Sequence, residues 1–209
     1  MSGSHATRFV TGLCLTASLF GLSHPGTASA KSKLTIEQFT APKEAGEVNS
    51  YLIQSEKDLV VVDGQMIVPM AQALVDRIKA TGKTPKAFIL THAHPDHYLG
   101  FAVLQDAFPG VPLYASEGVK ADFDKLAQGT LDHMSGMLGP AAPKNIATVQ
   151  VLPGNKLKLD GQEIRLEELK GGEHTVSALV HIKSLKVILA GDNLYQNTHL
   201  WMAECGSRE

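Results

Sequence analysis

The chain has 209 residues, of which 44% are hydrophobic and 19% are charged, and its formal net charge is −2 at pH 7. This length is enough for one domain with a real core. The nearly balanced charge offers no polybasic stripe, so neither nucleic acid nor an anionic membrane surface is an expected partner.

The first 30 residues are typical of a secretory signal peptide. Arg8 is followed by an apolar stretch over residues 9–22, and the tripeptide Ala-Ser-Ala that ends at Ala30 fits a cleavage site. A membrane anchor is the alternative, but the apolar stretch is shorter than the roughly 20 residues that span a bilayer. We therefore predict a signal peptide at 1–30, one domain at 31–209, and a periplasmic or secreted protein without an integral membrane anchor.

Cysteine usage restricts the kind of metal site that the mature protein can build. Cys14 lies in the predicted signal peptide, and the residues before it do not resemble a lipoprotein signal, so no lipidation is expected. Only Cys205 would remain after cleavage, which rules out a disulfide within the monomer. Metal binding must then rely on histidine and aspartate.

The period of the apolar residues predicts alternating strands and helices in the first half of the chain and strands in the second half. The expected elements of the first half are strands at 48–54 and 59–62, a helix at 68–80, a strand at 86–90, a helix at 97–108, a strand at 111–114 and a helix at 116–138. Gly129 and Gly136 are expected to break the last helix. The strands of the second half are expected at 148–152, 156–159, 162–169, 175–182 and 187–190. This order indicates a layered α/β fold with mixed sheets.

The segment from His92 to His97 places three imidazoles and one carboxylate within six residues, directly after a predicted strand. His92 and His94 alternate in an extended loop, so both side chains can reach one ion. Asp96 and His97 lie at the turn into a helix, where a second ion could be held. Zinc accepts imidazole nitrogen and carboxylate oxygen, and catalytic zinc sites leave one position for water. A lone histidine is more often structural, but this density of ligand-type residues favours a metal centre.

This motif resembles the H-x-H-x-D-H signature of the metallo-β-lactamase superfamily of metal-dependent hydrolases, and the resemblance extends from about Leu34 to Met202. It implies an αββα sandwich of two mixed sheets, with the metal site at one edge between the sheets. The metal ligands that it implies are His92, His94 and His174 for a first ion, Asp96 and His97 for a second ion, and Asp192 as a bridge between the two.

The later positions have weaker support from the residues themselves. His174 lies directly before an apolar strand, where a ligand and a structural residue are equally compatible with the pattern. Asp192 ends a buried strand and either forms a turn or faces a cation; the histidine cluster upstream favours the cation. Asp63 could form a simple turn with Gly64. The resemblance instead implies that Asp63 is not itself a ligand but supports the loop of residues 92–97, here called the metal loop.

The C-terminal part departs from the superfamily pattern. A further histidine usually completes the second site several tens of residues after the bridging aspartate, but this chain ends 17 residues after Asp192. His199 is the one downstream histidine, and it is either a ligand or a loop residue. The final strand and helices that the resemblance implies are also missing, so we expect a fold that is incomplete at its C-terminus and a second ion that binds more weakly.

A dinuclear centre predicts hydrolysis of a small molecule. A water held by two divalent cations becomes a hydroxide nucleophile near neutral pH, and one cation polarises the scissile carbonyl. Asp96 is expected to orient this nucleophile and to pass a proton to the leaving group. Zinc is the expected cofactor, as one or two ions, with iron or manganese as alternatives. Aspartate at position 192, instead of the cysteine or serine of the lactamases, favours an ester or lactone substrate over a lactam.

Two other functions remain open at this stage. One is a persulfide dioxygenase of the same fold, with a single iron held by His92, His94 and His174. The other is an inactive metal-binding remnant of the fold. The sequence does not predict the oligomeric state.

Several further side chains have both a functional and a structural interpretation. Tyr98, Tyr195 and Trp201 flank the ligand-bearing segments, so they either line a substrate entrance or serve in packing. His133 and Met134 lie in the long predicted helix, where they belong either to a lid over the pocket or to an ordinary surface.

Overall fold

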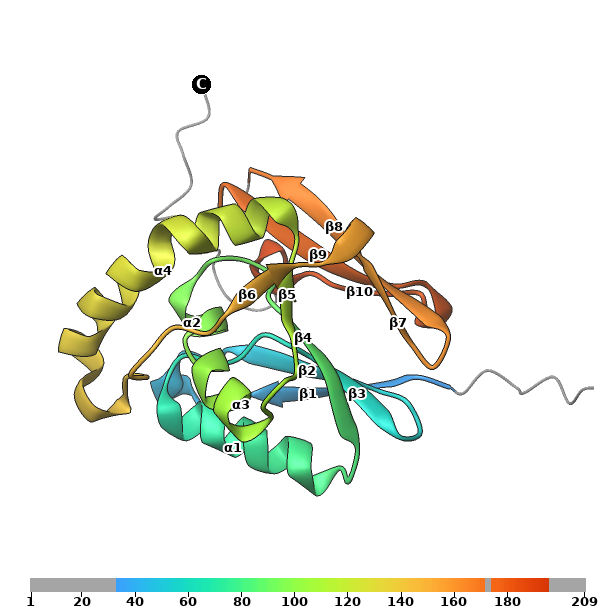
Figure 1. The fold of residues 1–209 in the computed structure, drawn as a ribbon, viewed down its shortest axis with the longest axis horizontal. Helices are drawn as coiled ribbons and strands as arrows, with labels where there is room; N and C mark the ends of the chain where they lie inside the picture. Colours follow the sequence, from blue (N-terminus) through green and yellow to red (C-terminus); the bar gives the residue numbers. More distant parts are fainter. Residues whose placement is uncertain (1–32, 172–173, 196–209) are drawn as a thin grey trace, which may run out of the picture. The chain divides into compact units, whose positions relative to one another are not determined.

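The computed structural model describes residues 33–171 and 174–195 (Figure 1). The strands are β1 (Thr35–Thr40), β2 (Asn49–Gln54), β3 (Asp58–Val62), β4 (Thr84–Ile89), β5 (Leu113–Ala115), β6 (Val149–Val151), β7 (Lys156–Leu159), β8 (Gln162–Lys170), β9 (Val176–Ile182) and β10 (Val187–Leu189). The α-helices are α1 (Val68–Ala80), α2 (Pro95–Tyr98), α3 (Phe101–Ala107) and α4 (Glu117–Leu138). The predicted signal peptide, Cys205, His199 and Trp201 lie outside the described residues.

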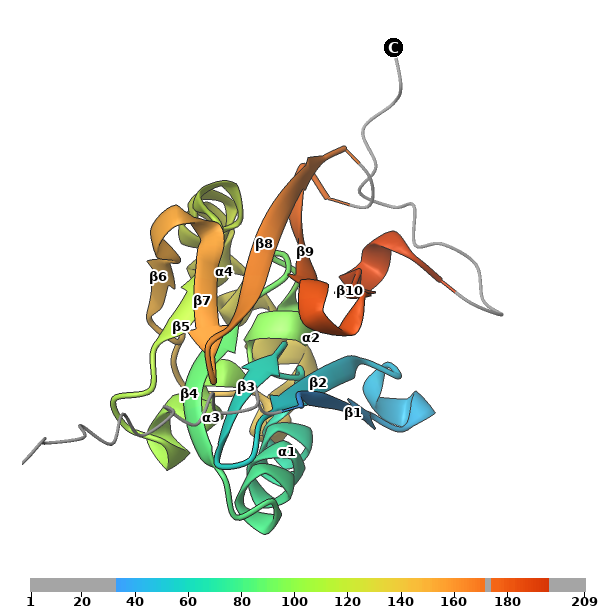
Figure 2. The ribbon, with the colours of Figure 1, turned by 90° about the vertical axis from the view of Figure 1, so that its right-hand side faces the viewer.

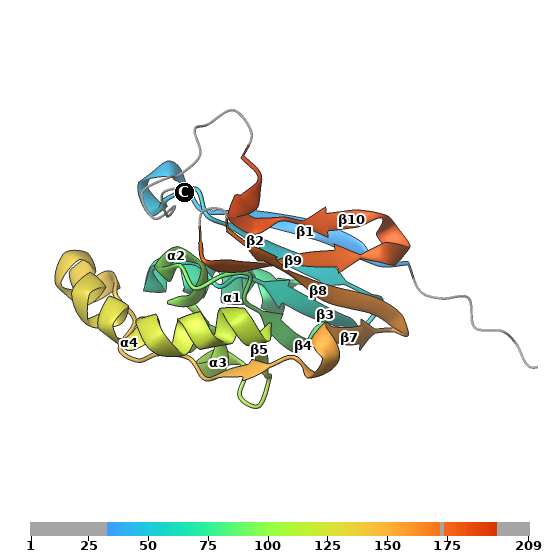
Figure 3. The same cartoon turned by 90° about the horizontal axis from the view of Figure 1, so that it is seen from above.

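The strands form two sheets, which lie in separate layers in Figures 2 and 3. The first sheet has the order β1-β2-β3-β4-β5-β6; its first three strands are antiparallel and its last four are parallel, so it is mixed as predicted. The second sheet has the order β10-β9-β8-β7 and is antiparallel throughout its described strands. β1 was not predicted; it lies at the edge of the sheet, and each of its residues is exposed or only partly buried.

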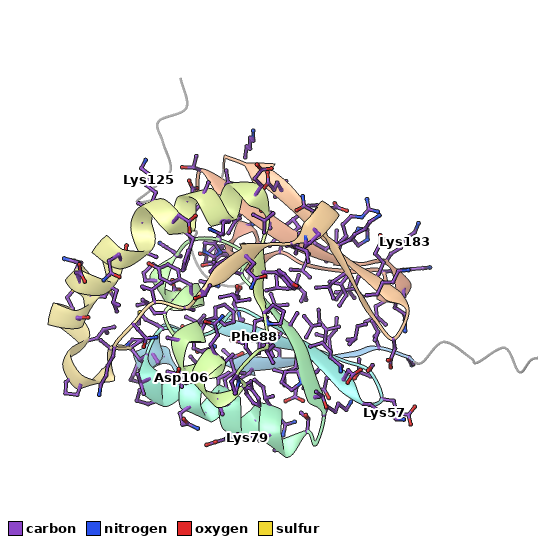
Figure 4. All side chains as sticks on the ribbon, in the orientation of Figure 1. Lys57, Lys79, Phe88, Asp106, Lys125 and Lys183 are labelled. Atoms are coloured by element: carbon purple, nitrogen blue, oxygen red, sulfur yellow. The ribbon has the colours of Figure 1, made fainter. Side chains whose placement is uncertain are left out.

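One apolar core joins the facing sides of both sheets and the helices. Phe88 of β4 is fully buried and stacks on Phe101 of α3, with ring centroids 5.8 Å apart. Figure 4 shows Phe88 in the interior, while Lys57 and Lys183 extend outward from the ends of the strands. In the first half of β8, the buried Ile164 and Leu166 alternate with charged residues, which is the pattern of a sheet with one face in water. The fold is thus the predicted layered α/β sandwich.

The helices gather around the first sheet. α1 and α3 contact each other on its outer side, and α4 contacts β6, β9 and α2 (Figure 3). α1 begins and ends where the apolar period predicts. α4 is continuous, so the predicted breaks at Gly129 and Gly136 are wrong: both positions face open space, and glycine in a helix costs only about 0.5–1 kcal/mol. Among the described helices, none has the length and apolar composition that crossing a bilayer requires.

The helix predicted at 97–108 is two helices, α2 and α3, which are separated at Gly100. The Gly100 N–H donates to the carbonyl oxygen of Gln65 at 2.8 Å. A Cβ atom at Gly100 would lie 2.1 Å from the carbonyl oxygen of Gly64, so only glycine permits this approach. The loop after β3 therefore lies directly against the joint between α2 and α3.

Candidate metal centre

Four loops meet at one edge of the two sheets. They follow β3, β4 and β10, and the fourth precedes β9. The loop after β4 is tied to the second sheet, because the Ala178 N–H donates to the Thr91 carbonyl at 2.7 Å and His92 forms an isolated antiparallel bridge with Ser177. Side chains from both halves of the chain can therefore reach one position.

The backbone of the metal loop is extended, as the sequence predicts. His94 has φ −97° and ψ 139° and directly precedes α2, and Pro95 occupies the first position of that helix. A proline there fits the helix start and favours an extended conformation for the residue before it. The extended backbone lets His92 and His94 reach the same region, with ring centroids 5.5 Å apart.

All six predicted ligands lie in this cluster. They form three sets whose ligand atoms lie within 4.8 Å of one another: His92, His94 and His174; His92, His97 and Asp192; and His94, Asp96 and Asp192. Asp192 belongs to two of the sets. Its Oδ1 lies 3.4 Å from His97 Nε2, which also lies 3.5 Å from Asp96 Oδ2. The arrangement thus offers ligand atoms for more than one cation.

Asp63 stabilises this cluster through contacts with Thr91 and His97. It is 1% exposed, and its carboxylate makes both contacts. Its Oδ1 accepts the Thr91 N–H at 2.9 Å. Its Oδ2 accepts the Thr91 hydroxyl at 2.8 Å and lies 2.9 Å from Nδ1 of His97. Asp63 therefore orients both the metal loop and one ligand ring.

Thr91, to which sequence reasoning gave no role, fixes the protonation pattern of His92. Because the Thr91 hydroxyl hydrogen is donated to Asp63, Thr91 Oγ1 must accept from His92 Nδ1, which lies 2.9 Å away. The proton then lies on Nδ1, and Nε2 of His92 has a free lone pair. That nitrogen is buried and has no hydrogen-bond partner in the described part of the chain. An orphaned buried polar atom costs about 1–3 kcal/mol, and a bound cation would satisfy it. The donor set and this orphaned nitrogen both fit a divalent metal.

Burial and neighbouring charges shift the pKa values of three side chains in the cluster. Burial lowers the pKa of His92 well below its ordinary value, so His92 stays neutral, as a metal ligand must. Burial also lowers the pKa of His97, but the carboxylates of Asp96 and Asp63 outweigh it and hold that pKa well above its ordinary value. Burial raises the pKa of Asp192, yet the hydrogen bond from His97 and its charge bring it well below its ordinary value. In the metal-free protein a charged His97 therefore offsets part of the negative charge of the carboxylates.

The structure places the other candidate side chains in three different settings. Tyr98 is buried and packs edge-on against Phe123, with centroids 5.1 Å apart, so it serves in packing and does not line an entrance. Tyr195 lies beside the cluster, where its hydroxyl donates to Asp192 Oδ2 at 3.0 Å. His133 is exposed on α4 and Met134 is partly buried there. No contact of these two tests the predicted lid.

Comparison with known proteins defines the class of this chain. The sequence profile of the metallo-beta-lactamase superfamily matches residues 44–206, so the chain belongs to this superfamily, whose members include metal-dependent hydrolases. Its fold is similar to the crystal structure of BLEG-1 B3 metallo-beta-lactamase, with a TM-score of 0.61, 24% identity, and coverage of 78% of this chain and 74% of that one. A di-iron-bound form of TTHA1623 is similar at a TM-score of 0.59 and 25% identity, with the same coverage of both chains.

Among curated proteins, the chain is similar to a hydroxyacylglutathione hydrolase of Edwardsiella ictaluri (strain 93-146). The two are 29% identical over 146 residues, which make up 69% of this chain and 45% of that protein. The chain therefore spans about half the length of the curated relative that it matches. The superfamily, the fold and a His/Asp cluster together imply a metal cofactor.

Proposed function

We propose that the protein is a zinc-dependent hydrolase that cleaves the acyl bond of a small molecule. The observation that carries the proposal is the convergence of six ligand-type side chains in one cluster, which includes the orphaned Nε2 of His92. His92, His94 and His174 would hold the first ion, whereas Asp96 and His97 would hold the second, with Asp192 shared between the two. At such a centre a divalent cation supplies Lewis acidity, which makes a bound water more acidic and polarises a carbonyl.

The protein's own groups would prepare this chemistry. The contacts of Asp63 and Thr91 keep His92 in one tautomer, so its lone pair is aimed at the ion before any substrate arrives. The side chain of Asp96 is 26% exposed, so it is partly open to solvent. Asp96 is therefore placed to accept the proton of the attacking water and to return it to the leaving group.

The substrate class that we propose is an ester, a lactone or a thioester, with a lactam as the less favoured bond. Aspartate at position 192 argues against a dedicated lactamase. The relative named hydroxyacylglutathione hydrolase adds a thioester of glutathione to the candidates. We further propose that the protein acts in the periplasm or outside the cell, because residues 1–30 have the pattern of a cleaved signal peptide.

Metal analysis combined with a substrate panel tests the proposal. The purified protein would be assayed with and without added zinc against nitrocefin, an acyl-homoserine lactone, a chromogenic ester and a hydroxyacylglutathione. We expect zinc-dependent turnover of the ester, lactone or thioester and up to two zinc ions per chain. One bound iron, with oxygen uptake on a persulfide, would replace the proposal with the dioxygenase. A folded, metal-bound protein without turnover would indicate an inactive remnant.

A further inference from the structure

The turn that carries Asp192 is linked to β9 by the side chain of Asn193. The Asn193 Nδ2 group donates to the Ala190 carbonyl at 2.7 Å, which closes the turn that begins where β10 ends. The Asn193 Oδ1 atom accepts the Ser177 hydroxyl at 3.0 Å. This amide therefore connects the turn after β10 to β9.

Ser177 is also the point at which β9 meets the metal loop. It is 6% exposed, and its backbone forms the antiparallel bridge with His92. The chain His92–Ser177–Asn193 thus connects a ligand of the first ion with the residue next to Asp192. Gly191 adds a close approach in the same place, because a Cβ atom there would lie 3.1 Å from Thr91 Oγ1.

We infer that Asn193 is a positioning residue that fixes the separation between Asp192 and the histidine ligands, through its hydrogen bonds to Ser177 and Ala190. The inference rests on the proposed function, since it concerns the ligand that the two ions would share. Asn193 itself is not offered as a ligand; its effect is transmitted through the turn. Loss of its amide would remove the link between the Asp192 turn and Ser177, while the backbone bridge between His92 and Ser177 would remain.

The inference predicts selective weakening of one ion. Zinc affinity would be measured by competition with a chromophoric chelator, on wild type, Asn193→Ala, Ser177→Ala and the double variant. Asn193→Ala is expected to weaken the less tightly held ion by about 10- to 100-fold, the range for removal of a residue that orients a ligand. The tighter ion should be weakened much less, because His92, His94 and His174 would remain its ligands. Ser177→Ala is expected to act in the same direction. The double variant should be no worse than Asn193→Ala, because both changes break one connection.

Two further variants separate positioning from a general loss of structure. Asn145→Ala, in the exposed loop before β6, is the matched control and should bind both ions normally. Asn193→Asp keeps an acceptor for Ser177 but cannot donate to Ala190, so an intermediate loss is expected, and circular dichroism would verify folding of each variant. Unchanged affinity for both ions in folded Asn193→Ala, or equal weakening of both, would overturn the inference alone. A wild-type protein that binds no zinc would overturn the proposed function and the inference with it.

Discussion

The close approach of Gly100 to the loop after β3 makes a substitution there a direct test of how the metal loop is supported. In Gly100→Ala the new methyl group would lie 2.1 Å from the Gly64 carbonyl oxygen, 2.8 Å from that of Gln65 and 2.9 Å from Ala71 Cβ. Overpacking of this kind costs about 1–3 kcal/mol, and we expect about 3 kcal/mol because two of the three neighbours are backbone atoms that cannot rotate away. The turn at Gly64 would move with them, and Asp63 would move away from His97.

Urea unfolding followed by circular dichroism, together with zinc titration, measures both consequences for Gly100→Ala. Gly129→Ala is the matched control, because no heavy atom lies within 4 Å of its new methyl group and the site is inside α4. It should stabilise the protein by about 0.5–1 kcal/mol. Gly100→Ala with wild-type stability and wild-type zinc affinity would refute the proposed link between the helix joint and the metal loop.

Five other outcomes are expected. His94→Ala should abolish zinc binding at the first site and with it turnover; retained activity at unchanged metal content would contradict the ligand assignment. Thr91→Val keeps the side chain's shape but removes its hydroxyl, so zinc affinity should fall about 10- to 100-fold, whereas the exposed control Thr84→Val should not change it. Because the pKa of His97 is raised in the metal-free fold, zinc must displace its proton, so zinc affinity should increase with pH through the region above the ordinary value of 6.5. The same raised pKa stabilises the metal-free protein below that ordinary value, so its thermal stability should fall as pH rises through the pKa of folded His97; a flat profile would argue against a charged His97. N-terminal sequencing of protein exported from a host cell should begin at Lys31, and a retained leader would disprove the signal peptide.

The parts of this molecule that depend on neighbouring residues in the chain were predictable from the sequence. α1 has an amphipathic period over its whole length, and its predicted ends agree with the structure. The ligands from His92 to His97 are close in sequence, and their short spacing already indicates a common centre. His174 and Asp192 could be added only through the resemblance, because nothing local distinguishes them from turn residues.

The parts that depend on contacts between distant segments were not predictable. The interruption at Gly100 arises from the carbonyl of Gly64, which a helical period does not reveal. The role of Thr91 requires Asp63 to lie within hydrogen-bond distance. The role of Asn193 requires β9 to lie beside the turn after β10. In each case a common residue gains its role from the packing of two elements far apart in sequence.

The bridge between His92 and Ser177 joins the loop of one sheet to a strand of the other, so the metal centre lies on the seam of the sandwich. A cation bound there would act as a cross-link between the sheets. Its ligands between His92 and His97 follow β4 of the first sheet, whereas His174 and Asp192 lie in loops of the second sheet. Removing the cation would then lower the stability of the contact between the two sheets, because their separation would no longer require breaking metal–ligand bonds. Protease sensitivity along β9 and β10 should therefore report metal occupancy as directly as turnover does.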